Sequence, residues 1–160
     1  MRPFFVLFLL VLVLLMIFSW QKYRRNQALK IVQNSSKKVT DEAFLHCIKQ
    51  LKFSEYDGSK VINEIASEYI ADVWGKGVLA FEYSIDAQKI TTDQLPLIKE
   101  ELTHLLNKYA KTQNLPSLNG HPVFCISDIW LFADVLHVDI AHVANQSTLG
   151  YLQDIKKLEE

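Results

Sequence analysis

The sequence predicts an α+β protein: an N-terminal single transmembrane helix followed by a small domain. The predicted order of that domain is α-α-β-α-β-β-α, with a three-stranded mixed sheet. Three observations lead to this prediction. Residues 3–20 form one unbroken uncharged stretch, the apolar residues of 93–112 recur at helical spacing, and those of 77–86 alternate as in a strand. Helices and strands together favour a sheet with helices packed on one face.

The uncharged stretch 3–20 is typical of a helix that spans a membrane. At about 1.5 Å rise per residue it is roughly 27 Å long, close to the thickness of a bilayer's hydrocarbon core. Trp20 and Tyr23 suit the belt of aromatic residues at a membrane interface. A cleaved signal peptide is the alternative, but it normally ends in two small residues spaced two apart, and none lie near the end of this stretch. The sequence therefore predicts an uncleaved signal anchor, a single-pass membrane protein and contact with the lipid bilayer through residues 3–20.

Basic residues beside the stretch bear on its orientation. Lys22, Arg24 and Arg25 follow it, whereas Arg2 precedes it. Because basic residues gather on the cytoplasmic side of a membrane, the domain is expected in the cytoplasm rather than outside it.

The two cysteines agree with this orientation. Cys47 and Cys125 both lie within apolar patterns, which indicates buried thiols in a reducing compartment. A disulfide between them is the alternative for a domain on the outer side. His46 lies beside Cys47, but neighbouring helical residues point about 100° apart, so no nucleophile and base pair is predicted.

We divide the chain into a transmembrane anchor (1–20), a juxtamembrane helix and linker (21–38) and an α+β globular domain (39–160). The polar run 34–38 is interpreted as a break between helices. Two helices, at about 41–52 and 59–74, are expected before the first strand, 77–86. The first of them is capped by Thr40 or Asp41.

The second half of the domain begins with the long helix 93–112, which carries Pro96 in its first turn. Strands 123–132 and 135–145 follow, and only Ala133 and Asp134 separate them, so a tight hairpin is predicted. Ser147 is the expected cap of a terminal helix. If strands 77–86 and 123–132 are neighbours in the sheet, the long helix makes a right-handed crossover between them.

Charge and composition exclude one class of function. The chain has 17 basic and 18 acidic side chains, and no basic face stands out beyond the cluster after residue 20. A nucleic-acid binder needs several phosphate-neutralising side chains grouped on one surface, so no nucleic-acid partner is predicted. No catalytic or cofactor motif is present either, which weighs against an enzyme and predicts no cofactor.

His137 and Asp139 are the weak candidates for a metal site. They are two residues apart on a predicted strand and therefore project from the same face. His121 or Cys125 would have to supply a third ligand, because metal sites need three or four. The alternative is that His137 and Asp139 form a polar pair on the solvated face of an outer strand.

Strand 123–132 is apolar on both of its faces. Alternation places Phe124, Ile126, Trp130 and Phe132 on one face, and Val123, Cys125, Ile129 and Leu131 on the other. A three-stranded sheet with helices on one face leaves the second face to be covered. The first two helices, a partner protein, a second copy or a lipid-like ligand would supply that cover. We predict an interaction or ligand surface that includes Phe124, Trp130, Phe132 and Tyr83.

Three functional hypotheses follow. The first is a non-catalytic, single-pass membrane-anchored accessory or interaction protein of a membrane or envelope complex, with a protein partner or self-association. The second is a membrane-tethered binding domain for an apolar or lipid-like ligand, held in a pocket lined by Trp130, Phe124 and Tyr83. The third is a metal-dependent enzyme that uses His137 and Asp139.

Overall fold

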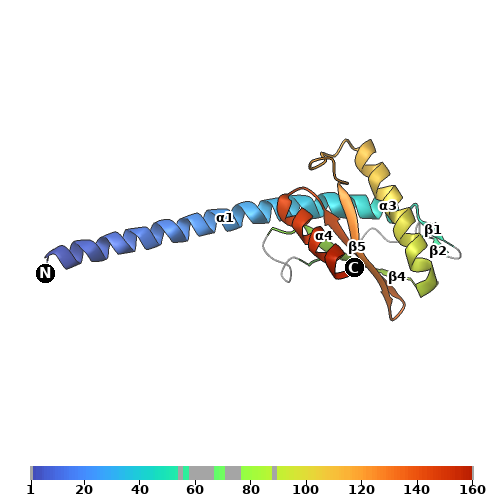
Figure 1. Cartoon of the computed structure of the whole chain (residues 1–160), viewed down its shortest axis with the longest axis horizontal. Coiled ribbons are helices and arrows are strands. Elements are labelled where there is room, and N and C mark those ends of the chain that lie inside the picture. The colour runs from blue at the N-terminus through green and yellow to red at the C-terminus, as the bar shows by residue number, and fades with distance from the viewer. Residues whose placement is uncertain (1, 54–55, 58–66, 71–76, 88–89, 160) are drawn as a thin grey trace. The chain divides into compact units, whose positions relative to one another are not determined.

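A computed structural model describes residues 2–53, 56–57, 67–70, 77–87 and 90–159; the side chains of 2–7, 9, 53, 56–57 and 159 lie outside the description. The chain forms two compact units, Met1–Asn34 and Ser35–Glu160. The first unit is helical throughout its described residues, and the second is an α+β domain (Figure 1).

Helix α1 (Arg2–Ile48) runs without interruption through the polar run 34–38, so the predicted break and the separate helix at 41–52 are wrong. The polar side chains in this region have partners within the second unit. Ser36 Oγ lies 2.7 Å from His142 Nδ1, and Thr40 Oγ1 donates to the Ser36 carbonyl at 2.9 Å. Lys37 and Asp41 form an ion pair at 3.0 Å, at the helical spacing of four residues. Ser36 thus makes a buried polar contact inside a helix, and Lys37 makes a half-buried one.

The predicted membrane span is also wrong. Among the residues that the structure describes, no helix combines the length and the apolar character needed to cross a membrane. The signal anchor, the single-pass membrane location and the transmembrane part of the fold prediction are therefore overturned.

The sheet has four antiparallel strands among the described residues, in the order β3-β4-β6-β5, rather than three mixed ones. These strands are β3 (Ser67–Tyr69), β4 (Ala80–Asp86), β5 (Phe124–Phe132) and β6 (Val135–His142). Strand β3 lies inside the predicted helix 59–74, most of which is outside the described residues. A separate short pair, β1 (Lys52–Phe53) and β2 (Tyr56–Asp57), follows α1.

The predicted crossover from β4 to β5 does not join neighbouring strands, because β6 lies between them. It pairs with β4 from Ala80↔Ala141 to Asp86↔Val135, and with β5 on its other side. Strands β4 and β5 therefore run in the same direction but are separated by β6. The tight β5–β6 hairpin favours this order, because consecutive strands joined by two residues must pair with each other.

Helices α3 (Leu95–Thr112) and α4 (Gln146–Glu159) agree with the predicted helical segments. A single 3-10 turn, η2 (Thr92–Gln94), leads into α3. The cap of α4 is Asn145 rather than Ser147, because Asn145 Oδ1 accepts from Thr148 N at 2.8 Å and from Thr148 Oγ1 at 2.9 Å.

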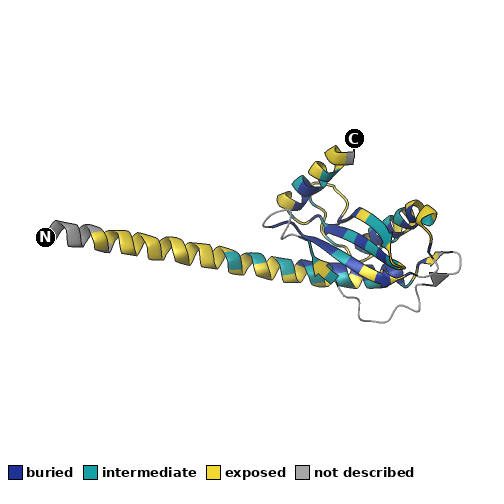
Figure 2. Cartoon of the chain, turned by 90° about the horizontal axis from the view of Figure 1, so that it is seen from below, coloured by how far each residue is buried: buried dark blue, intermediate teal, exposed yellow. Residues whose placement is uncertain are grey.

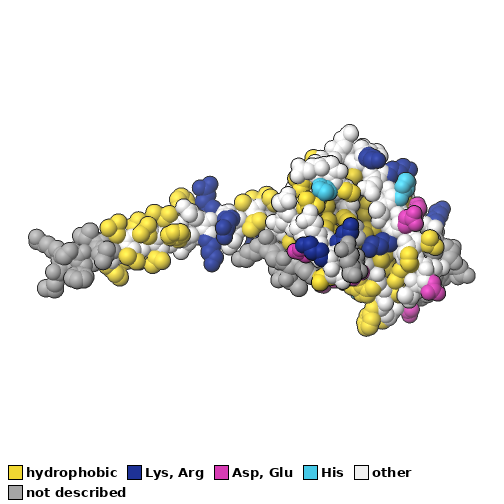
Figure 3. Space-filling model, viewed as in Figure 1, with side chains coloured by type: hydrophobic (Ala, Val, Ile, Leu, Met, Phe, Trp, Pro, Cys, Tyr) yellow, Lys and Arg dark blue, Asp and Glu magenta, His cyan; other side chains and the backbone are white. Residues whose placement is uncertain are grey.

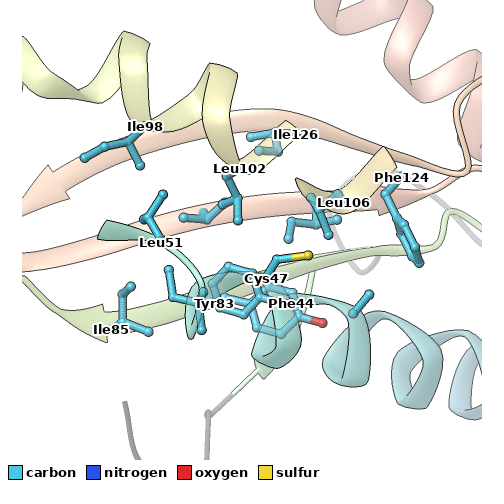
Figure 4. Close-up of a cluster of buried hydrophobic side chains, with 14 of the residues drawn as sticks. Phe44, Cys47, Leu51, Tyr83, Ile85, Ile98, Leu102, Leu106, Phe124 and Ile126 are labelled. Carbon is cyan, nitrogen blue, oxygen red and sulfur yellow. The ribbon is translucent and has the colours of Figure 1, made fainter. Parts of the chain in front are cut away.

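The main core lies between one face of the sheet and the helices α1 and α3. Phe44, Cys47 and Ile48 of α1 are fully buried there, as are Ile98 and Leu102 of α3. Figure 4 shows side chains of α1, Phe44 and Cys47 among them, and of α3, Ile98 and Leu102 among them, gathered against the sheet. The ring centroids of Phe44 and Tyr83 are 4.2 Å apart. The second face is covered in part by α4, through a smaller cluster of Val78, Ala80, Ala141 and Tyr151. The burial colours of Figure 2 show the strands dark between these layers.

The β5–β6 hairpin offers a test of local strain. Ala133 and Asp134 both have positive φ angles, +48° and +64°, a conformation that suits Asn-Gly far better than Ala-Asp. The double change Ala133→Asn, Asp134→Gly is expected to raise the free energy of unfolding by about 1 kcal/mol. Urea denaturation measures this as a higher midpoint with an unchanged slope. Ala144→Gly, at an exposed residue with negative φ, is the control, and an equal gain there would contradict the explanation.

Candidate functional site

A β-bulge decides which side chains share the second face of the sheet. The register between β5 and β6 shifts between Ile126 and Asp128, so Ser127 is an extra residue. Before the bulge, Phe124 and Ile126 point into the main core; after it, Ile129 and Leu131 pack against that core instead. Trp130 and Phe132 therefore point to the opposite face. The simple alternation of a regular strand does not hold along β5.

The predicted surface residues are accordingly not brought together. Phe124 and Tyr83 are buried in the main core with 1% and 0% exposure, so they line no pocket with Trp130. Trp130 is half-buried on the second face, beside His137, and Phe132 is 71% exposed near the hairpin. His137 and Asp139 lie on the same second face as Trp130, as their spacing on β6 predicts.

His137 is held by contacts on three sides. Its ring stacks on Trp130, with centroids 4.9 Å apart and planes 5° from parallel. Its Nδ1 lies 2.8 Å from Glu82 Oε1 and 3.1 Å from Ser84 Oγ, both on the neighbouring strand β4. An imidazole with a carboxylate at Nδ1 has a fixed ring orientation. We name this group, which comprises Glu82, Ser84, Asp128, Trp130, His137 and Asp139, the open-face cluster.

Asp139 has a strongly perturbed carboxyl. Burial, together with the negative charges of Glu82 and Asp128, raises its pKa to about 7 from an ordinary 3.8. Its Oδ1 is buried, and the described residues provide it with no hydrogen-bond partner. A neutral carboxyl costs less in that position than a carboxylate. Asp139 is therefore a group that takes up a proton near neutral pH.

Helix α4 bounds this cluster on one side. Tyr151 is buried, and its hydroxyl donates to Ser127 Oγ at 3.2 Å. Ser127 Oγ in turn donates to the Asp139 carbonyl at 3.4 Å, a long contact across the bulge. The bulge residue thus connects α4 to β6 through its side chain, next to Asp139.

The open-face cluster does not form a metal centre. Across the described ranges, no group of three or more His, Cys, Asp or Glu side chains has the geometry to hold a metal ion. His137 is paired with Glu82 instead, and the suggested third ligands, His121 and Cys125, line a different pocket beside α4. The polar partner of His137 is therefore Glu82 rather than Asp139, and β6 lies between β4 and β5 rather than at an edge of the described sheet.

The thiols are not activated nucleophiles. Burial raises the pKa of Cys47 to about 12, and burial also raises that of Cys125. Both cysteines are free. Cys47 lies in the main core, whereas Cys125 lies on the other face of the sheet, beside Ala141.

The sequence pattern identifies His137 as a candidate residue, but it does not identify the two β4 residues that contact its ring. Glu82 and Ser84 alternate along β4 with the buried Phe81, Tyr83 and Ile85. They therefore lie on the other face of the same strand. That alternation is visible in the sequence and marks them as a polar strand face. What the sequence does not show is that β4 pairs with β6, which places this face against His137.

Comparison with protein-family models, with curated proteins and with solved structures finds no match for this chain. Any functional conclusion therefore depends on its own residues.

Proposed function

We propose that this chain is a non-catalytic interaction protein that assembles with apolar helices of a partner protein through the first part of α1. The observation that carries the proposal is a continuous run of large apolar side chains, each 44% to 70% exposed. We call this run, Leu10–Phe18, the exposed apolar segment. Nine consecutive helical positions, at about 100° each, point in every direction around the helix axis.

A helix that is apolar on all sides is normally buried, either within a protein assembly or in a membrane. Since none of the described helices is long and apolar enough to cross a membrane, helices of another protein are the cover that we propose. One partner helix covers a single face, so a bundle of several helices suits the segment better than a pair.

Charge indicates the chemistry of the partner. Lys22, Arg24 and Arg25 are exposed within two turns after the segment. The Arg24 guanidinium lies 5.8 Å from the Trp20 ring centroid. In a parallel bundle of identical chains these cations would gather and repel one another. A partner whose apolar helices are followed by acidic residues would pair with them. That complementarity favours a different protein over a second copy of this one.

The proposal is tested by photo-crosslinking in cells with a diazirine amino acid at Leu14 of the full chain. Adducts should form with polypeptides whose crosslinked peptide is an apolar helix flanked by Asp or Glu. The matched control places the same probe at Leu97 of α3, which is 55% exposed but isolated, and should give no such adduct. Adducts with lipid alone, or with peptides that lack an apolar helix, contradict the proposal.

A charge in the middle of the segment should abolish the association. Leu14→Glu is expected to lower recovery of the crosslinked partner at least about tenfold, because an unpaired carboxylate is costly among apolar helices. Leu97→Glu is the control and should leave recovery unchanged. Unchanged recovery with Leu14→Glu would show that the segment is not the contact.

A further inference from the structure

A pocket of about 410 Å³ lies between α4 and the edge strand β5. Its apolar wall is formed by Cys125 and Ile126 of β5, by Val143 and by Leu149, Leu152 and Ile155 of α4. The volume falls in the range of small-molecule sites, about 300–1,000 Å³. Figure 3 shows apolar surface on this face of the domain with Lys side chains around it.

The way in which α4 packs on the sheet leaves this space open. Its first turn is fixed, because Thr148 Oγ1 accepts from Leu79 N at 2.9 Å and Leu149 is buried. The sheet residues beneath α4, Ala80 and Ala141, are small. Farther along the helix, Leu152 and Ile155 are only half-buried, although they face the domain. These two side chains therefore leave apolar surface that a ligand is able to cover.

The rim of the pocket is basic. Lys99 of α3, His121 and Lys156 of α4 line it, and none of the described residues around it is acidic. Lys99 is half-buried. Burial raises the pKa of the Cys125 thiol there, and the Lys99 charge opposes that rise. Lys156 and His121 are exposed, so Lys99 is the cation best shielded from water.

We infer that this pocket binds an alkyl carboxylate of medium chain length, with its chain along the apolar wall and its carboxylate on Lys99. One half-buried ammonium group matches one negative charge, and the small volume matches a single chain rather than a two-chain lipid. This site is independent of the association proposed for α1.

Photo-affinity labelling tests the site on the full chain. The probe is dodecanoic acid with a diazirine in its chain, and labelled peptides are mapped by mass spectrometry. Label is expected in the β5 and α4 peptides that carry Cys125, Leu152 and Ile155. Octanoate, decanoate and dodecanoate should compete, whereas dodecanol, which lacks the charge, should compete less. Label confined to residues 8–20 would show non-specific binding to the exposed apolar segment and overturn the inference.

Two pairs of variants give matched comparisons. Ile155→Trp fills the pocket and should reduce labelling about tenfold, whereas Leu158→Trp, at a 76% exposed residue of the same helix, should not. Lys99→Met should weaken dodecanoate competition about threefold to fivefold, the size of a half-exposed ion pair, and leave dodecanol competition unchanged. Lys108→Met, on an exposed position of α3, is its control. Circular dichroism checks that each variant folds like the wild type. If the two variants of either pair then change labelling or competition equally, the proposed site is contradicted.

Discussion

Replacing Phe44 by alanine is expected to lower the free energy of unfolding by about 3–5 kcal/mol, since it removes a large, fully buried side chain. Phe44 belongs to α1 and packs against Tyr83 of β4, with 4.2 Å between the ring centroids. Small domains are stable by only about 5–15 kcal/mol, so this single change removes a large fraction of the total. Urea denaturation followed by circular dichroism measures it as a lower midpoint.

Polar contacts near Phe44 explain why the structure does not easily rearrange to recover the stability that Phe44→Ala removes. The Tyr83 hydroxyl donates to Asp41 Oδ1 at 2.8 Å, and Ser67 Oγ donates to the same oxygen at 2.8 Å. Lys37 is hydrogen-bonded to Ser67 as well as to Asp41. This network fixes α1 over β3 and β4, so the helix is not free to move into the space that Phe44 leaves.

Phe132→Ala is the matched control for Phe44→Ala. Phe132 has the same side chain but is 71% exposed, so its removal should change the free energy of unfolding by less than about 0.5 kcal/mol. Equal effects at the two positions would mean that residues 35–48 of α1 are not part of the domain core.

Asp139→Asn is expected to stabilise the protein at pH 8 and to change almost nothing at pH 3. In the folded state burial raises the pKa of Asp139 to about 7 from its ordinary 3.8. Between pH 4 and pH 7 the folded protein therefore keeps a proton that the unfolded chain has released. Because the folded state then binds more protons, its stability falls as the pH rises through this range. At pH 3 and below, the carboxyl is protonated in both states and the penalty disappears.

The size of the effect follows from the same shift. The full shift corresponds to about 4 kcal/mol, and partial exposure of Asp139 to solvent reduces this to about 1–2 kcal/mol. Asparagine has the same shape but never ionises, so the difference between variant and wild type should grow from about zero at pH 3 to this value at pH 8. Urea denaturation at both pH values measures it, with Asp154→Asn, an exposed carboxylate on α4, as control. A pH-independent difference between Asp139→Asn and wild type would contradict the shift.

The elements that the sequence predicted well are those whose pattern is local. Helix α3 carries its apolar residues at helical spacing and Pro96 in its first turn, and the structure confirms it at Leu95–Thr112. Strand β4 alternates between buried and partly exposed residues. The β5–β6 hairpin is predicted from the two residues that connect its strands.

The wrong predictions depend on partners that are distant in sequence. Ser36 is compatible with a helix interior because its hydroxyl meets His142, which is 106 residues away. Strand β3 is extended because it pairs with β4, whereas Ser67–Tyr69 by itself fits a helical pattern. At Ser127 a single extra residue moves Trp130 to the opposite face from Phe124, and no composition signal marks that position. The candidate site could therefore be predicted only as far as His137 and Asp139.

The bulge at Ser127 also affects how this sheet ends. An exposed edge strand is a template on which another chain adds a strand, and continuous growth of that kind leads to aggregation. Strand β5 is the long edge, but the bulge interrupts its regular spacing, and the exposed carboxylate of Asp128 follows it directly. Among the described residues the opposite edge, β3, is three residues long. Both described edges are therefore poor templates for strand addition, which disfavours growth into aggregates.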